Sequence, residues 1–136
     1  MEEKEELQKK IIAYRVLESK LNSFVKQRDI LLSKLVEIQN TLTSIEEIKK
    51  RKDEILFPLG SETFMRGRIV SKNKIIVGIG ANIALEKSIE DAKKILEKRK
   101  LEIETNLNEI QKSILNISSQ LEKLGPEITK LAERLK

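Results

Sequence analysis

Apolar residues recur at every third or fourth position through the first 56 residues of the chain. Starting at Leu7 and stepping alternately by three and four, every position except Lys10 and Arg28 is apolar. This spacing is typical of a coiled-coil seam rather than of a helix that lies on a globule. Residues 1–56 contain no Gly or Pro, so we expect one long helix there. The seam positions are Leu7, Lys10, Tyr14, Leu17, Leu21, Phe24, Arg28, Leu31, Leu35, Ile38, Leu42 and Ile45.

The same pattern returns in residues 88–136, where only Lys93 and Lys100 interrupt the apolar series. Ser88 and the acidic residues just after it indicate a helix start, because they cap free N–H groups and suit the helix dipole. Two matched seams predict antiparallel helices, with both termini at one end and the intervening insert at the other. The second seam comprises Ile89, Lys93, Leu96, Lys100, Ile103, Leu107, Ile110, Ile114, Ile117, Leu121, Leu124, Ile128, Leu131 and Leu135.

The residues between the two helical patterns predict strands. Four of the five glycines lie between Pro58 and Gly80, and short apolar runs there are separated by turn-forming residues. We therefore expect two β-hairpins in residues 57–87. The predicted fold is α+β: helix 1–56, hairpins 57–87 and helix 88–136, which form one structural domain.

Composition narrows the classes of function. The chain of 136 residues is 36% charged and only 3% aromatic, a mixture typical of long helices and coiled coils. It has no His and no Cys, which excludes a zinc finger, a thiolate nucleophile and an imidazole base. We expect no enzyme activity, no catalytic residues, no metal and no cofactor. The charged opening MEEKEELQKK resembles no signal peptide, so we expect a cytoplasmic protein without a membrane segment.

The net charge of +5 does not predict a nucleic-acid-binding surface. Most of the excess falls within residues 57–88, and the long flanking segments interleave both signs with few aromatic residues for base stacking. Gly78-Ile79-Gly80-Ala81 resembles half of a dinucleotide-binding motif. A strand is predicted where that motif requires a helix, so turn and packing roles explain these glycines better.

The predicted hairpins carry more apolar surface than two hairpins can cover. Isolated hairpins are marginally stable, and their open edges invite pairing with other strands. We therefore expect this region to pair with the same region of other subunits. The predicted oligomerisation residues are Phe57, Leu59, Phe64, Ile69, Ile75, Val77, Ile79, Ile83 and Leu85.

The chain termini form a second candidate surface. Ile11, Ile12 and Val16 lie off the first seam and would leave this tip apolar around most of its circumference. Scattered exposed apolar side chains are also ordinary on protein surfaces. Pro126 is predicted to kink or loosen the last segment, which would let seam residues there reach a ligand. The predicted tip residues are Leu7, Ile11, Ile12, Tyr14, Val16, Leu17, Leu124, Ile128, Leu131 and Leu135.

This layout resembles the alpha-type subunits of the prefoldin family, particularly the archaeal ones. Phe57-Pro58-Leu59-Gly60-Ser61, with Phe64 close behind, is similar to the family's P-L-G-S-x-x-F stretch. Ile75-Ile76-Val77-Gly78-Ile79-Gly80-Ala81 is similar to its V-x-V-G-x-G-A stretch, and Leu85-Glu86-Lys87-Ser88 to its V-E-K-S helix start. The specific motifs cover residues 57–92, whereas the layout covers the whole chain.

The resemblance implies an ATP-independent chaperone. In that family, two alpha and four beta subunits form a hexamer whose hairpins build a β-barrel platform. The coiled-coil tips capture unfolded polypeptides and transfer them to a group II chaperonin.

Two alternatives remain at this point. One is a filament-forming gamma-type prefoldin or a coiled-coil spacer protein, and the other is a helical hairpin that binds nucleic acid.

Overall fold

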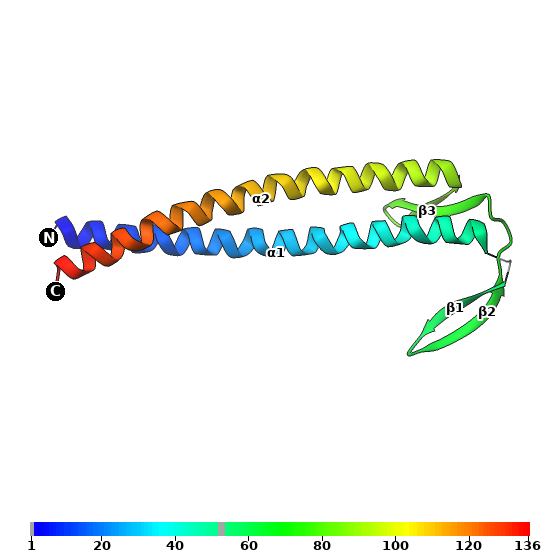
Figure 1. The fold of residues 1–136 in the computed structure, drawn as a ribbon, viewed down its shortest axis with the longest axis horizontal. Helices are drawn as coiled ribbons and strands as arrows, with labels where there is room; N and C mark the ends of the chain where they lie inside the picture. The colour runs from blue at the N-terminus through cyan, green and yellow to red at the C-terminus, as the bar shows by residue number, and fades with distance from the viewer. Residues whose placement is uncertain (1, 52–53) are drawn as a thin grey trace. The chain divides into compact units, whose positions relative to one another are not determined.

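The computed structural model describes residues 2–51 and 54–136 (Figure 1). In chain order, the elements are helix α1 (Glu2–Lys50), strands β1 (Glu54–Gly60), β2 (Thr63–Arg68), β3 (Lys74–Gly80) and β4 (Ile83–Ser88), and helix α2 (Ile89–Arg134). The strands form two antiparallel two-stranded sheets, β1–β2 and β3–β4. The predicted arrangement of two long helices with two β-hairpins between them is confirmed.

The first helix ends earlier than the sequence pattern predicted. α1 stops at Lys50, and Glu54–Leu56, which were expected to belong to the helix, lie in strand β1. Residues 1, 52 and 53 of the expected 1–56 helix lie outside the described residues. Two effects account for the early change to strand. Pro58 disfavours helical backbone at Phe57. Cross-strand pairing of Ile55 with Gly67 then extends the strand toward the N-terminus.

The described residues divide into two compact units. The first unit contains residues 1–34 and 103–136, and the second contains residues 35–102. In a two-helix coil each residue contacts only its neighbours along the helices, so the contacts do not tie distant segments into one core.

In the first unit, α1 and α2 run antiparallel along their apolar seams. Lys10 lies beside Glu127, and Leu31 and Ile110 line the same hollow, so residue numbers rise along one helix as they fall along the other. Every predicted seam position in this unit is half-buried or buried. The most deeply covered are Leu107, Ile117 and Leu131.

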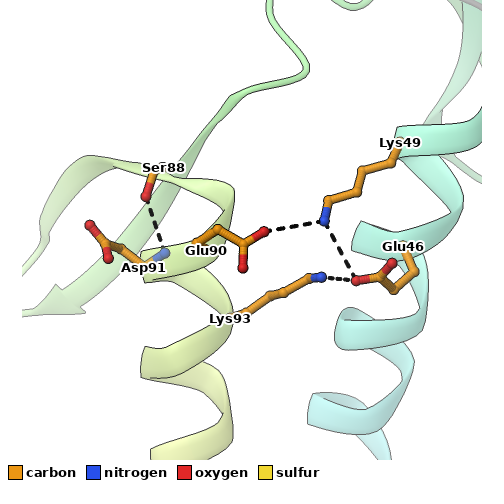
Figure 2. A network of polar contacts seen from close by, with 6 residues as sticks. All are labelled: Glu46, Lys49, Ser88, Glu90, Asp91 and Lys93. Atoms are coloured by element: carbon orange, nitrogen blue, oxygen red, sulfur yellow. Dashed lines mark hydrogen bonds and ion pairs between the residues drawn. The ribbon is translucent and has the colours of Figure 1, made fainter.

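The second unit continues the pattern and adds a network of ion pairs. Figure 2 shows Glu46 of α1 between Lys49 and Lys93, and Lys49 reaching Glu90 of α2 at 3.5 Å. Lys93 occupies a predicted seam position, and its ion pair with Glu46 provides a countercharge for an ammonium group that the seam partly buries.

The start of α2 confirms the predicted cap. The Asp91 backbone N–H donates to the Ser88 hydroxyl at 3.1 Å (Figure 2), which satisfies one of the free donors of the first turn. The Ile89 N–H donates to the Asn73 carbonyl at 3.1 Å. The helix start is therefore bonded both to its own cap and to the segment that precedes β3.

At the other end of α2, the helix runs uninterrupted through Pro126 to Arg134. The expected loosening of the final segment is not seen as a break in the helix. Leu124, Ile128 and Leu131 stay in phase across the proline and remain half-buried or buried, so seam packing holds the last turns in place.

The two hairpins have the same backbone design. Each contains a two-residue turn preceded by a register shift, between Pro58 and Gly60 in one and between Gly78 and Gly80 in the other. Gly60 and Gly80 have φ angles of 114° and 111°, which glycine adopts readily. This internal similarity, offset by twenty residues, was not apparent in the sequence pattern because the strand side chains differ.

The turn residues that follow those glycines are strained. Ser61 and Glu62 have φ angles of 49° and 61°, and Ala81 and Asn82 have 51° and 60°. Positive φ at both positions is a feature of type I′ turns, which favour Asn and Gly. Three of these four side chains thus occupy a backbone region in which Asn is the best tolerated residue after glycine.

The β3–β4 hairpin is anchored on α2. Arg99 donates to the Gly78 carbonyl at 2.6 Å, and Val77 is buried. In the β1–β2 hairpin, the Phe57 ring lies directly over Gly67, where a Cβ atom would come within 2.2 Å of the ring. Gly67 therefore provides the space that the aromatic ring occupies.

The turn geometry predicts that substitution by glycine affects stability unequally at equivalent turn positions of the two hairpins. Glu62→Gly should relieve left-handed strain and stabilise its hairpin by about 0.5–1 kcal/mol. Asn82→Gly, the matched control in the other hairpin, should change stability little because Asn tolerates this backbone region. Amide hydrogen exchange of the hairpin residues measures both effects, and equal protection changes in the two variants would contradict the strain argument.

Candidate functional site

The terminal end of the coil, defined here as residues 2–20 of α1 and 120–134 of α2, brings the two chain ends side by side (Figure 1). At this end α1 contributes off-seam apolar side chains that pairing with α2 does not cover. Ile12 is 61% exposed and Val16 is 48% exposed. The expectation that apolar surface remains open here is met by these two residues.

Ile11 differs from its expected position. It is half-buried rather than on the outer surface, because it flanks the seam on the side that faces Gly125 and Ile128. The remaining predicted tip residues lie on the seam itself. Leu131 is buried, and the half-buried members are Leu7, Tyr14, Leu17, Leu124, Ile128 and Leu135.

A notch opens beside the seam at this end. It has a volume of about 390 Å³, and its apolar walls are Ile11, Tyr14 and Ile128. Gly125 forms part of the lining, and a Cβ atom at Gly125 would lie 3.7 Å from the Tyr14 ring. The absence of a side chain at Gly125 thus leaves room for an apolar group to reach the seam from outside.

The heptad spacing alone did not predict this notch. The signal that would have found it is a residue without a side chain at the position flanking the seam, opposite an aromatic ring. A coiled coil normally covers its seam with longer side chains at such positions.

One seam position of the terminal end is charged. The Lys10 ammonium donates to Glu127 Oε2 at 3.2 Å and lies 3.6 Å from Glu6 Oε1. The hydrogen bond to Glu127, reinforced by the charges of both carboxylates and partly opposed by desolvation, raises the pKa of Lys10 above its ordinary value of 10.5. This ion pair joins α1 to α2 within the candidate site.

All predicted oligomerisation residues belong to the second unit, and all predicted tip residues belong to the first. Val77 is buried within the chain, because β3 packs one face inward, so it is already covered without a partner. Ile69 and Ile75 are half-buried. The exposed members are Phe57, Leu59, Phe64, Ile79, Ile83 and Leu85.

More apolar side chains are exposed on the hairpins than the predicted oligomerisation residues alone, since Leu56, Met65 and Ile76 also project outward. Ile76 is 74% exposed although its strand neighbour Val77 is buried. Alternation along β3 explains the difference, because successive side chains point to opposite faces.

Among the described residues, neither helix has a stretch long and apolar enough to cross a membrane. The same residues contain no cluster of three or more acidic, His or Cys side chains arranged to hold a metal ion.

The family model for prefoldin subunits matches residues 17–134 of this chain, which includes both helices and both hairpins. The chain belongs to the prefoldin family. Members of this family are chaperone subunits and not enzymes, and the predicted family resemblance is confirmed.

The relatives of this chain include prefoldin alpha subunits. The prefoldin subunit alpha of Pyrococcus horikoshii is 32% identical over 133 residues, which cover 96% of this chain and 87% of the relative. The prefoldin subunit alpha of Thermococcus onnurineus is 35% identical over 101 residues, 72% of this chain and 69% of the relative. The alpha-type resemblance proposed from the hairpin motifs is in agreement with these relatives.

Solved prefoldin structures share the fold. Filamentous PFD from Methanocaldococcus jannaschii aligns with a TM-score of 0.72 and 20% identity, over 85% of this chain and 97% of the neighbour. The prefoldin beta subunit from Thermococcus strain KS-1 aligns with a TM-score of 0.63 and 14% identity, over 92% and 90%. At these identities the likeness establishes the fold alone.

The Lys10 ion pair predicts a pH dependence. Because the folded-state pKa of Lys10 is raised, the pair stabilises the folded prefoldin subunit at neutral pH, and this contribution is lost as the pH rises above about 10.5. Glu127→Gln should lower the pKa of Lys10 and flatten the fall in stability above about pH 10.5. Carbon-13 NMR of the lysine Cε atoms and thermal unfolding measure the two effects.

Glu122→Gln is the matched control, since it removes a carboxylate from the same helix at an exposed position. A Lys10 titration that is unchanged by Glu127→Gln, or changed equally by Glu122→Gln, would contradict the assigned cause.

Proposed function

We propose that this chain is the alpha-type subunit of an ATP-independent holdase. In this proposal the terminal end of the coil captures unfolded polypeptides in the cytoplasm and transfers them to a group II chaperonin. The observation that carries the proposal is the apolar surface that helix pairing leaves open there, formed by Ile12, Val16 and the notch beside Gly125. Apolar surface that helix pairing leaves exposed is suited to binding other chains.

The geometry supports weak capture. Two exposed aliphatic side chains and a shallow notch can bury only part of a client, at roughly 25 cal/mol per Å² of apolar area. Strong retention then requires several such ends to act on one client, because linked weak sites raise the overall affinity without new contacts. Weak individual contacts also allow each client segment to leave, which transfer to a chaperonin requires.

The hairpins supply the means to join several coils. Leu56, Leu59, Phe64 and Met65 of the first hairpin are each at least 57% exposed. Their open strand edges and apolar faces are suited to pairing with other strands. We propose that they pair with beta-type prefoldin subunits, in a hexamer of two alpha and four beta chains whose hairpins form a β-barrel platform.

A second candidate is a filament-forming, gamma-type assembly. Its support is the structural likeness to filamentous PFD, which has the same fold at 20% identity. The two candidates differ in how hairpins assemble, and mass measurement distinguishes them.

Removal of the exposed tip residues should weaken client capture. The double variant Ile12→Ser and Val16→Ser should lose most suppression of aggregation of a denatured protein, because the uncovered apolar surface is removed while the seam remains. Light scattering of a heat- or dilution-denatured client measures the effect.

The matched control is Val36→Ser with Leu115→Ser, which removes similar side chains that are 55% and 71% exposed. Suppression should be retained in this control. Equal loss in both double variants would show that general surface apolarity, and not the terminal end, binds the client.

Assembly provides an independent prediction. Mixed with a beta-type prefoldin subunit, the chain should form a discrete hexamer by native mass measurement, and Leu59→Ser with Phe64→Ser should prevent it by removing exposed hairpin surface. Long polymers of this chain alone would favour the filament candidate. Those two residues lie outside the seam, so helix content should stay constant.

A further inference from the structure

A second groove runs along the coil of the first unit, beside the seam and separate from the Gly125 notch. It consists of two adjoining hollows of about 420 and 380 Å³, and both include Gln27 in their lining. One hollow extends from Leu17 past Phe24, and the other reaches Leu31 and Ile110. The seam forms the apolar floor of this groove.

Charged side chains are scarcer in the walls of the groove than in the chain as a whole, and most of the polar side chains there are uncharged. In a protein whose residues are 36% charged, the two hollows contain only one cation, Lys20, and one anion, Glu109. The other polar lining residues carry amides or hydroxyls. We call them the amide groove residues, and they are Ser23, Gln27, Asn106, Ser113, Asn116 and Gln120.

These side chains offer donors and acceptors side by side. Gln120 Nε2 donates to Asn116 Oδ1 at 3.3 Å, which holds the two amides together along α2. Each side-chain amide carries an NH₂ group and a carbonyl oxygen, so Asn116 retains donors and Gln120 retains an acceptor. A ligand that matches this surface presents alternating N–H and C=O groups without net charge.

We propose that the amide groove binds the backbone of an extended segment of unfolded polypeptide. Only an extended chain presents unpaired backbone N–H and C=O groups along its length, whereas those groups are already bonded within a helix. A nucleic acid or acidic peptide would require a cationic lining, and Lys20 and Glu109 cancel. The neutral groove thus complements a neutral peptide backbone.

The dimensions of the groove suit this ligand. Residues 17–31 of α1 span about 21 Å of helix, which equals about six residues of extended chain. The Leu17 end is shared with the predicted tip residues, so a chain held at the terminal end could continue into the groove. Ile30, which is 57% exposed, lines the opposite end and offers apolar contact to a client side chain.

This inference deepens the proposed function and depends on it, since the ligand is the same class of unfolded chain. It adds hydrogen bonds to the backbone of the client, and these contacts are therefore independent of the client's sequence. The apolar surface at the terminal end instead selects apolar side chains.

The test replaces the amides by apolar residues of similar size. In the full-length chain, Gln27→Met, Asn116→Leu and Gln120→Met remove hydrogen-bonding groups while preserving helix-forming residues. The probe is a fluorescent uncharged peptide of about twelve Ala, Thr and Gln residues, compared with the same peptide N-methylated at alternate positions. Fluorescence anisotropy measures affinity, and circular dichroism checks the fold.

We expect the triple variant to bind the parent peptide about tenfold more weakly than the unmodified chain does. The unmodified chain should also bind the N-methylated peptide about tenfold more weakly than the parent. The matched control is Gln39→Met, Asn108→Leu and Gln111→Met, three exposed positions outside both the groove lining and the terminal end, and it should bind normally.

Hydrophobic capture alone predicts the opposite sign, because the triple variant exposes more apolar surface. Equal or tighter binding by that variant overturns the inference, as does equal binding of both peptides or no binding of either. The proposed function can fail while this inference holds. That outcome would be seen if the Ile12→Ser, Val16→Ser variant still protected denatured clients while the groove variant no longer bound the peptide.

Discussion

Burial in this molecule depends on a single apolar seam between two antiparallel helices. Such a seam is only one layer thick, so each helix covers one stripe of its partner and leaves the other faces in solvent. Few residues are deeply buried, and most of those on the helices, including Ile45, Leu107 and Leu131, lie on the seam. Any apolar residue off the seam must stay exposed or find another partner. The exposed surfaces at the terminal end and on the hairpins follow from this constraint.

The seam also determines where charge is tolerated. Two of the charged residues that interrupt it, Lys10 and Lys93, each form an ion pair with a carboxylate of the opposite helix, Glu127 for Lys10 and Glu46 for Lys93. Such cross-helix pairs disfavour a shifted alignment, because a shift would leave a partly buried ammonium group unpaired. Arg28 behaves differently, since its guanidinium contacts its own neighbour Asp29 at 3.3 Å. Lys10 and Lys93 therefore each contribute an ion pair that depends on register, whereas the contact of Arg28 does not.

Sequence reasoning succeeded where one periodic pattern decided the structure and failed where local geometry did. All seam positions are at least half-buried, because heptad spacing leaves helices one efficient way to pair. The end of α1 was missed because no Gly or Pro marks Lys50, and the change to strand arises from pairing with a later segment. The inward face of Val77 and the Gly125 notch depend on which neighbour lies opposite, which spacing alone does not show.

The two flanks of the seam differ chemically, and each of the two proposed client contacts depends on one of them. On one flank, Ile11 and Tyr14 meet Gly125, so a small residue opens apolar surface. On the other, Gln27 and Asn116 line a groove that is neutral and rich in hydrogen-bonding groups. An unfolded chain displays both apolar side chains and unpaired backbone, whereas a folded protein hides most of both. A coil that offers one weak contact for each feature would discriminate between these states without recognising any particular sequence, because a ligand that makes both contacts is held more tightly than one that makes either alone.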